Sequence, residues 1–300
     1  MINILLIGGT GCVGSATREA LAQLAPHATI TILTRDPLKT QGASSAEYVA
    51  GNILDEESLV TALKEHSITH VLHCAALRTT DCAENPTLAY QMNVLGTQNV
   101  MDAIAEYGGV ERLVFTSTAA IYAVGDKPNP HTHEDDQKQL LNPYTATKLA
   151  GESLLEGNAH HRQQATTILR PQVIFGPHRL SEGSTAGITI AIEKAKQGTP
   201  FTIPFSGTTG FHYSTDVGLA HALALLESPE HFCCYNLPAE SISIETICEM
   251  LNDAAGLELI SLLERHYPFP AGLDSTKFAN AFPSFKQTTF NEAIKKAFSS

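Results

Sequence analysis

The sequence predicts an α/β protein built on a doubly wound parallel sheet. Apolar, strand-like stretches alternate with helical patterns through the first half of the chain, as they do in successive βαβ units. The first stretch, Ile2–Ile7, runs directly into glycines at Gly8, Gly11 and Gly14, and a helical pattern follows. A buried strand that turns through glycines into a helix is typical of the start of a Rossmann fold.

The other elements follow from apolar runs bounded by turn residues and helix caps. The strands predicted in the first half are Thr29–Thr34, Glu47–Ala50, His70–Ala75, Arg112–Thr118 and Thr166–Arg170. The helices predicted there are Ala16–Leu24, Asp55–His66, Pro86–Gly108 and Tyr144–Glu156. Residues 125–142 are polar and lack periodicity, which indicates a long surface loop.

The alternation of strand-like and helical stretches becomes less regular after Gly176, where we expect shorter elements. They are a helix at Ile188–Gln197, a strand at Phe201–Phe205, an apolar run at Val217–Leu226, a strand at Cys234–Leu237 and helices at Ile244–Leu251 and Phe290–Phe298.

The composition indicates a soluble globular protein, because 43% of the 300 residues are hydrophobic and 17% are charged. The formal net charge of −12 and the absence of a Lys/Arg cluster argue against nucleic acid as a partner. No apolar stretch approaches the roughly 18 residues that cross a membrane, and no signal peptide is evident. The six cysteines include no C-x-x-C pair, so we expect free thiols and a cytoplasmic location.

The glycine turn predicts a site for a dinucleotide phosphate. Its spacing is G-x-x-G-x-x-G, and it lies between a strand and a helix. Such a turn aims backbone N–H groups and the positive end of a helix at one place, which suits a pyrophosphate. The cofactor-binding residues expected in this turn are Gly8, Thr10, Gly11, Cys12, Val13 and Gly14.

The end of the second strand bears on which cofactor is bound. Many NAD-binding proteins carry an acid here, about 20 residues past the glycines, that holds the ribose 2′-hydroxyl. This chain has Thr34 followed by Arg35. Because an arginine accommodates a 2′-phosphate, the sequence favours NADP. In the alternative, Arg35 is solvated, Asp36 binds the ribose and the cofactor is NAD.

Tyr144 and Lys148 predict an acid/base pair. Residues four apart on a helix share one face, so the phenol and the ammonium point the same way. A tyrosine with its ordinary pKa of about 10 is a poor base at neutral pH, and a nearby ammonium lowers that pKa. The pair would then exchange a proton with a substrate hydroxyl or carbonyl. On its own the pattern is weak, because most such pairs are a half-buried tyrosine beside a solvated lysine.

Three features occur together in one order: the glycine turn, Ser117-Thr118 at the end of the fifth strand, and Tyr144 with Lys148. In this combination the chain resembles the short-chain dehydrogenase/reductase superfamily, and within it the extended branch, the NAD-dependent epimerase/dehydratase family. The resemblance covers nearly the whole chain. The matching segments are Asn52-Ile53, His73–Ala76, Tyr90–Thr97, Phe115–Tyr122, Leu169–Pro177, Phe211–Leu219, Tyr235–Leu237 and Leu273–Lys277.

The resemblance implies an enzyme that transfers hydride at a C–OH or C=O carbon. In it Tyr144 is the general acid/base, and Lys148 lowers its pKa and binds the nicotinamide ribose. Thr118, with Ser117 beside it, bonds the substrate oxygen. The resemblance also implies cofactor contacts by Asn52, Ile53, Ala75, Ala76, Asn93, Pro171 and Val173. For Asn93 the alternative is a side chain that bonds only backbone groups.

The resemblance implies a nucleotide-sugar substrate near Leu77, Thr118, Glu134 and Arg265. For Arg265 the alternative is a surface arginine beside Glu264. A diphosphate-binding arginine usually lies seven residues before the position of Asp216, and this chain has Thr209 there. The missing arginine leaves open a second function, an NADPH-dependent carbonyl or alcohol oxidoreductase acting on a less charged molecule. A third, a non-catalytic NADP-binding sensor, has no need to keep the intact catalytic residues.

We expect residues 1–175 to form the dinucleotide-binding domain, with residues 211–237 returning to it. Residues 176–210 and 238–300 are then the substrate-binding segments of a smaller, interleaved domain. A homodimer through the helices around Asn93 and Tyr144 is compatible with the resemblance. We interpret the His131-Thr132-His133 segment as part of an acidic loop with incidental histidines, so no metal site is expected.

Overall fold

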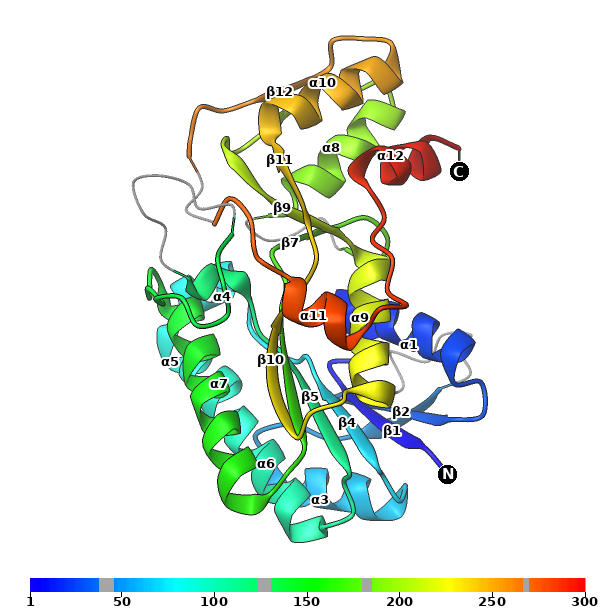
Figure 1. Ribbon diagram of the computed structural model, residues 1–300, viewed down its shortest axis with the longest axis vertical. Coiled ribbons are helices and arrows are strands. Elements are labelled where there is room, and N and C mark those ends of the chain that lie inside the picture. Colours follow the sequence, from blue (N-terminus) through cyan, green and yellow to red (C-terminus); the bar gives the residue numbers. More distant parts are fainter. Residues whose placement is uncertain (38–45, 123–130, 180–184, 267–269, 300) are drawn as a thin grey trace.

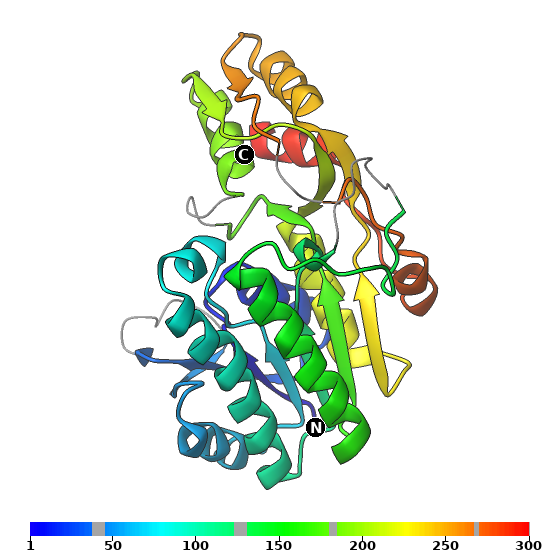
Figure 2. The same ribbon diagram turned by 90° about the vertical axis from the view of Figure 1, so that its left-hand side faces the viewer.

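Figures 1 and 2 show the computed structural model of the chain, which describes residues 1–37, 46–122, 131–179, 185–266 and 270–299. A seven-stranded sheet runs in the order β10-β6-β5-β4-β1-β2-β3, and every neighbouring pair is parallel. Its strands are Asn3–Ile7 (β1), Thr29–Thr34 (β2), Glu47–Ala50 (β3), His70–His73 (β4), Arg112–Thr116 (β5), Thr166–Arg170 (β6) and Phe232–Asn236 (β10).

Helices cover both faces of this sheet, as Figure 2 shows. Strand β1 explains why, because its side chains alternate between two cores: Ile4 and Leu6 point to one, and Leu5 and Ile7 to the other. The first core includes residues of Cys12–Leu24 (α1), Ser214–Glu227 (α9) and Thr276–Ala281 (α11). The second includes residues of Glu56–Glu65 (α3), Gly96–Tyr107 (α6) and Pro143–Arg162 (α7). The predicted doubly wound sheet is therefore confirmed.

The helix predicted from Pro86 to Gly108 contains a local change of winding. It runs without a break through Pro86–Tyr90 (α5), a π-helical turn at Gln91–Leu95 and α6, after the shorter helix Thr79–Glu84 (α4). It ends at Gly108, whose φ of 71° lies in the left-handed region that glycine adopts without strain.

The second region lies above the large sheet in Figure 1 and has a core of its own. One sheet has the order β11-β9-β7, and a pair β12-β8 lies beside it. The strands are Val173–Phe175 (β7), Phe201–Ile203 (β8), Thr208–Tyr213 (β9), Glu240–Ser243 (β11) and Ile260–Leu262 (β12). The helices are Gly187–Lys196 (α8), Ile244–Ala255 (α10) and Phe290–Ser299 (α12).

A buried ion pair joins β6 to the long helix α7. Arg170 donates two hydrogen bonds to the carboxylate of Glu152, at 2.9 and 2.7 Å, and both side chains are nearly inaccessible to solvent. The same guanidinium donates to the hydroxyl of Tyr122 at 2.6 Å and to the backbone carbonyl of Glu134 at 2.8 Å. The pair therefore fixes the position of α7, which carries the predicted acid/base residues, against the sheet.

The differences from the predicted elements are small. Helix α7 continues past its predicted end at Glu156, and β8 stops two residues before Phe205. Part of the predicted loop at 125–142 lies outside the described residues. Among the helices that the structure describes, none has the length and apolar character to cross a bilayer.

Candidate active site

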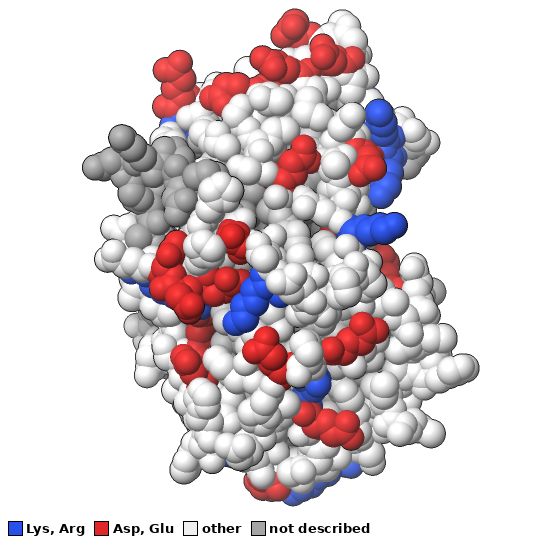
Figure 3. All heavy atoms as spheres, in the orientation of Figure 1, with Lys and Arg blue, Asp and Glu red and all other residues white. Residues whose placement is uncertain are grey.

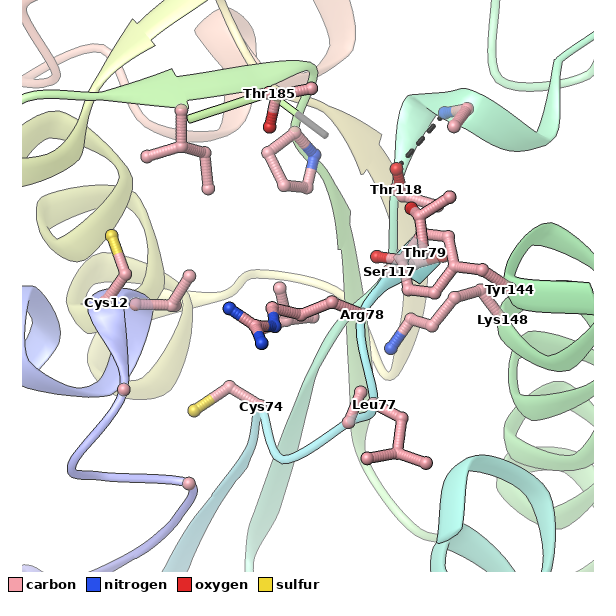
Figure 4. A pocket seen from close by; sticks show the side chains of 18 of the residues that line it. Cys12, Cys74, Leu77, Arg78, Thr79, Ser117, Thr118, Tyr144, Lys148 and Thr185 are labelled. Carbon is pink, nitrogen blue, oxygen red and sulfur yellow. Dashed lines mark hydrogen bonds between the residues drawn. The ribbon is translucent and has the colours of Figure 1, made fainter. Parts of the chain in front are cut away.

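A cavity of about 390 Å³ lies at the carboxyl ends of β1, β4, β5 and β6, where ligands bind in open α/β sheets. Figure 4 shows its interior. The side chains and backbone that line it come from Gly8, Gly11, Cys12, Val13, Gly14, Cys74, Ala76, Leu77, Arg78, Thr79, Thr116, Ser117, Thr118, Ala120, Tyr144, Lys148, Pro171, Gln172, Ile174, Arg179 and Thr185.

The glycine turn forms a cradle that side chains would fill. Gly8 has a φ of 92° and accepts a hydrogen bond from the N–H of Gly11 at 3.0 Å. A Cβ on Gly14 would lie 2.5 Å from the carbonyl oxygen of Gly8 and from the Cα of Gly9. Among the described residues no side chain caps α1, whose N-cap is Gly11, so the first turn of this helix, which lines the cavity, offers backbone N–H groups to a ligand. These features fit a pyrophosphate.

The predicted acid/base pair faces this cavity from α7. Asn142 caps that helix by accepting a hydrogen bond from the N–H of Thr145 at 3.0 Å, which places the first turn. Tyr144 and Lys148 lie one turn apart, and Figure 4 shows them beside Ser117. The helix thus brings the phenol and the ammonium to the end of strand β5.

Two hydroxyl groups follow β5 at the cavity. Thr118 accepts a hydrogen bond from the N–H of Ala120 at 3.2 Å, and among the described residues its O–H has no acceptor, so it can donate to a ligand. The Oγ of Ser117 is buried and has no hydrogen-bond partner among the described residues. Because an unsatisfied buried hydroxyl is costly, a ligand oxygen would supply the missing partner.

Lys148 is 3% exposed and lies over an aromatic ring. Its Nζ is 4.0 Å from the centre of the Phe115 ring, a cation–π contact. Burial lowers the pKa of Lys148 to about 8, although the carboxylate of Glu152 acts in the opposite direction. A desolvated ammonium favours an anionic neighbour, and a phenolate on Tyr144 would be one.

Several residues that the sequence predicts for the cofactor line the cavity and others do not. Those that line it are Gly8, Gly11, Cys12, Val13, Gly14, Ala76, Tyr144, Lys148 and Pro171. Those that lie outside it are Thr10, Thr34, Arg35, Asn52, Ile53, Ala75, Asn93 and Val173. Of the residues outside the cavity, Arg35 is exposed just after β2, at the carboxyl end of the parallel strands, where the glycine turn also follows β1.

Asn93 lies behind the cavity wall. Its side-chain oxygen accepts a hydrogen bond from the N–H of Leu77 at 2.7 Å, and its amide donates to the carbonyl of Leu77 at 3.2 Å and to the hydroxyl of Thr147 at 3.0 Å. Asn93 thus bonds backbone groups of Leu77, as the alternative expected, but it also bonds the hydroxyl of Thr147 on α7, so its contacts are not confined to the backbone. Asn93 holds Leu77, which lines the cavity, against the helix of the acid/base pair.

Val173 and its neighbour occupy opposite sides of β7. Val173 is 1% exposed and packs in the core of the second region, whereas Ile174 lines the cavity. Successive side chains of a strand point to opposite faces, and the pairing of β7 with β9 decides which residue faces the cavity.

The two charged residues predicted for the substrate lie outside the cavity. The carboxylate of Glu134 accepts a hydrogen bond from the backbone N–H of Asn236 at 2.8 Å. Arg265 is exposed on the second region and does not line the cavity. Thr209, in place of the usual arginine, is buried and bonds the carbonyl of Pro270 at 3.1 Å.

The structure adds two arginines to the site that the sequence did not indicate. Arg78 follows Leu77 after β4, and Arg179 follows Gly176-Pro177 after β7. Single arginines in loops produce no periodic signal. The only signal for them in the sequence is that each lies two residues after a family segment, His73–Ala76 or Leu169–Pro177.

Comparisons with known proteins agree with this geometry. A family model described as the NAD dependent epimerase/dehydratase family matches residues 4–236. N-acetyl-alpha-D-glucosaminyl-diphospho-ditrans,octacis-undecaprenol 4-epimerase of Escherichia coli O157:H7 is 33% identical over 176 residues, which cover 58% of this chain and 49% of that protein. UDP-glucose 4-epimerase of Halalkalibacterium halodurans is 34% identical over 153 residues, 50% of this chain and 44% of that protein. The chain thus aligns with about half the length of these relatives.

Solved structures match over nearly the full length. UDP-glucose 4-epimerase of Thermus thermophilus, a complex with NAD, superposes with a TM-score of 0.83 at 26% identity and covers 99% of this chain and 98% of that one. UDP-glucose 4-epimerase of Thermotoga maritima, with UDP-glucose, has a TM-score of 0.86 at 22% identity and covers 99% and 98%. The family match, extending from the first strand through β10, establishes that the chain belongs to the NAD-dependent epimerase/dehydratase family.

Proposed function

We propose that the protein is a nicotinamide-dinucleotide-dependent enzyme that transfers hydride at a C–OH or C=O carbon of a nucleotide sugar, as an epimerase or a dehydratase. One observation carries the proposal: Tyr144, Lys148 and the hydroxyls of Ser117 and Thr118 line the same cavity as the glycine turn. The names of the relatives, epimerases of diphosphate-linked sugars, support the substrate class.

In this proposal the glycine turn of Gly8, Gly11 and Gly14 would hold the cofactor, whose nicotinamide would supply the hydride chemistry when bound. Tyr144 takes the proton from the substrate hydroxyl, or returns it to a carbonyl. Lys148 stabilises the phenolate by its charge, in a setting where burial strengthens that interaction. Thr118 donates a hydrogen bond to the same substrate oxygen and so orients the reacting carbon.

The test of the function is a product assay with the purified protein. UDP-glucose, UDP-N-acetylglucosamine and dTDP-glucose are incubated with the protein, and products are identified by NMR while reduced nicotinamide is followed by absorbance. An epimerised or 4-keto product without net change in nicotinamide supports the proposal. If none of these sugars is altered while NADPH is steadily consumed with an aldehyde or ketone, the protein is a carbonyl reductase instead.

One observation favours the alternative function, an NADPH-dependent carbonyl or alcohol oxidoreductase. Thr209 stands where an arginine would hold a diphosphate, and its hydroxyl is occupied by the carbonyl of Pro270. A substrate without a diphosphate would not need the anchor. The non-catalytic sensor has no such support, because the predicted catalytic side chains all face the cavity.

For the cofactor we propose NADP, on the basis of Arg35. Its side chain is exposed just past β2, beside the edge where the ribose of a dinucleotide would lie. Charge-assisted hydrogen bonds contribute about 1.5–3 kcal/mol. Arg35→Ser is therefore expected to weaken NADP binding by about 10- to 100-fold and to leave NAD binding within about twofold.

Titration calorimetry with both cofactors tests this expectation. Arg162→Ser is a matched control, because Arg162 pairs with Asp102 at the far end of α7. Equal loss of NAD and NADP binding, or no loss of either, would contradict the assignment and leave NAD as the cofactor.

We further propose that residues 1–175, with residues 211–237 returning to them, hold the cofactor and that residues 176–210 and 238–300 bind the substrate. Arg179 and Thr185, from the first of these segments, already line the cavity. A homodimer through α6 and α7 is part of the proposal, and analytical ultracentrifugation would test it.

A further inference from the structure

Three hydroxyl groups follow one another where β5 ends. The molecular face in Figure 3 carries many carboxylates, whereas Thr116, Ser117 and Thr118 are neutral, and all three line the cavity. The O–H of Thr118 can donate to a ligand, and the Oγ of Ser117 has no hydrogen-bond partner among the described residues. Thr116 differs from both, because its hydroxyl is already bonded to a buried histidine ring.

The histidine is His221, which lies on α9 and is fully buried. Its Nδ1 is 2.7 Å from the backbone carbonyl oxygen of Val217. Because a carbonyl oxygen can only accept, Nδ1 carries a proton and donates it to Val217. Burial lowers the pKa of His221 to about 4, although this hydrogen bond acts in the opposite direction. The ring is therefore neutral at neutral pH, and its Nε2 has a lone pair.

The protonation of this ring decides which way the Thr116 hydroxyl points its proton. Its Oγ1 is 2.9 Å from Nε2 of His221, so the hydroxyl donates its single proton to the ring. The lone pairs of Oγ1 remain, and among the described residues Oγ1 forms no other hydrogen bond. Thr116 is partly exposed and lines the cavity, so a ligand can use these lone pairs. Thr116 thus offers the cavity an acceptor, where Thr118 offers a donor.

The acceptor lies on one side of the sheet and the acid/base pair on the other. Val114, two residues earlier on β5, packs in the first core with α9, and the bond to His221 places the side chain of Thr116 on that same side. Tyr144 and Lys148 reach the cavity from α7, which packs in the second core. A ligand that occupies the cavity at the end of β5 can therefore contact both.

The acceptor suits one group of a nicotinamide cofactor. At the reacting end of that cofactor, the carboxamide is the group that offers N–H donors. The ribose there offers hydroxyls, which can donate or accept, and Lys148 is the residue expected to bind it. An oxygen whose own proton is committed to a histidine matches an N–H and is mismatched with a carbonyl oxygen. An acceptor left unpaired beneath a bound ring would cost free energy.

We propose that Thr116 accepts a hydrogen bond from the carboxamide N–H of the nicotinamide, and that His221 positions the Thr116 hydroxyl as an acceptor by taking its proton. The contact helps to fix the rotation of the ring at the end of β5. Thr116 then determines specificity for the carboxamide, and His221 is a positioning residue. This inference rests on the proposed function for the nicotinamide cofactor and is independent of the substrate.

Equilibrium binding of cofactor analogues, measured by titration calorimetry, tests the contact without turnover. The probes are NADP and its acetylpyridine analogue, in which a methyl group replaces the NH2 of the carboxamide, and NAD with its own acetylpyridine analogue is measured in parallel. Loss of a neutral hydrogen bond predicts that the wild-type protein binds the carboxamide cofactor about two- to tenfold more tightly than the analogue. Thr116→Val removes the oxygen at nearly constant volume and should abolish this preference, whereas Thr116→Ser should keep it.

The other variants separate the contact from effects on folding. Thr61→Val, on the exposed face of α3, is the matched control and should leave the preference unchanged. Thr116→Val leaves Nε2 of His221 without a donor, so the double variant Thr116→Val/His221→Phe removes both polar partners and should fold while still lacking the preference. His221→Phe alone keeps the oxygen but frees its proton, and its preference should fall below that of the wild type.

The outcomes that overturn the proposal are distinct. The same preference in Thr116→Val, or in the double variant, as in the wild type would contradict the contact, and so would a wild-type protein that binds both members of each pair equally. An unchanged preference in His221→Phe would overturn the positioning role of His221. If the wild-type protein binds none of the four dinucleotides, the proposed function fails and the contact fails with it.

Discussion

Tyr144→Phe lowers kcat by about 100- to 10,000-fold, the range expected for removing a general acid/base. The substitution deletes a single oxygen and keeps the ring, so the packing of α7 is preserved. Lys148 and Thr118 still line the cavity in this variant, and in the proposed mechanism they orient the substrate without moving its proton. Cofactor affinity therefore stays within about twofold, because the glycine turn is untouched.

Two measurements are made on the same protein preparations. One is steady-state kinetics with the substrate that the product assay identifies, and the other is a titration with the cofactor. Tyr90→Phe is the control, because Tyr90 ends α5 with 61% of its surface exposed. Turnover by Tyr144→Phe at the level of Tyr90→Phe would rule out the proposed acid/base.

Glu152→Gln lowers the free energy of unfolding by about 3–5 kcal/mol, the usual cost of leaving one member of a buried ion pair without its partner. The glutamine has nearly the same shape, so the loss comes from charge and hydrogen bonding. Among the described residues, the remaining hydrogen-bond partners of the Arg170 guanidinium are neutral, the hydroxyl of Tyr122 and the carbonyl of Glu134.

Urea unfolding followed by circular dichroism measures this loss. Glu156→Gln, one turn further along α7 and exposed, is the matched control and should change stability by less than about 0.5 kcal/mol. The double variant Glu152→Leu/Arg170→Met removes both charges and should recover part of the loss. If Glu152→Gln is as stable as Glu156→Gln, the ion pair does not hold α7 in place.

The first half of the fold was predictable because its signals are local. An apolar strand, a glycine turn and a helical period each occupy a few neighbouring residues, as in Ile2–Leu24. Apart from β9, the strands of the second region have only three or four residues, and β7 and β9 carry no clear alternation. They form because distant segments pair, which no local window can show.

The site divides in the same way. The spacing of Tyr144 and Lys148 predicts their common face, because both are on one helix. The sequence motif points to Val173, but Ile174 lines the cavity, because the pairing of β7 with β9 decides which side chain faces it. Arg78 and Arg179 come together only because the two regions of the molecule meet at the cavity. These contacts depend on tertiary structure, so a sequence motif can identify a segment that lines the site but not which of its side chains faces the cavity.

The chain leaves the large sheet after β6 and returns to it at β10, so the two regions cannot be separated by a single cut. Strand β10 pairs with β6 only after the chain has passed through β7, β8 and β9. A protein truncated after β6 would expose a hydrogen-bonding edge and lack the helix α9, which packs against β4, β5 and α1. The segments of the second region therefore interrupt and follow the part of the chain that forms the large sheet, and exchanging both between relatives would require three junctions, one after β6, one before α9 and one after β10.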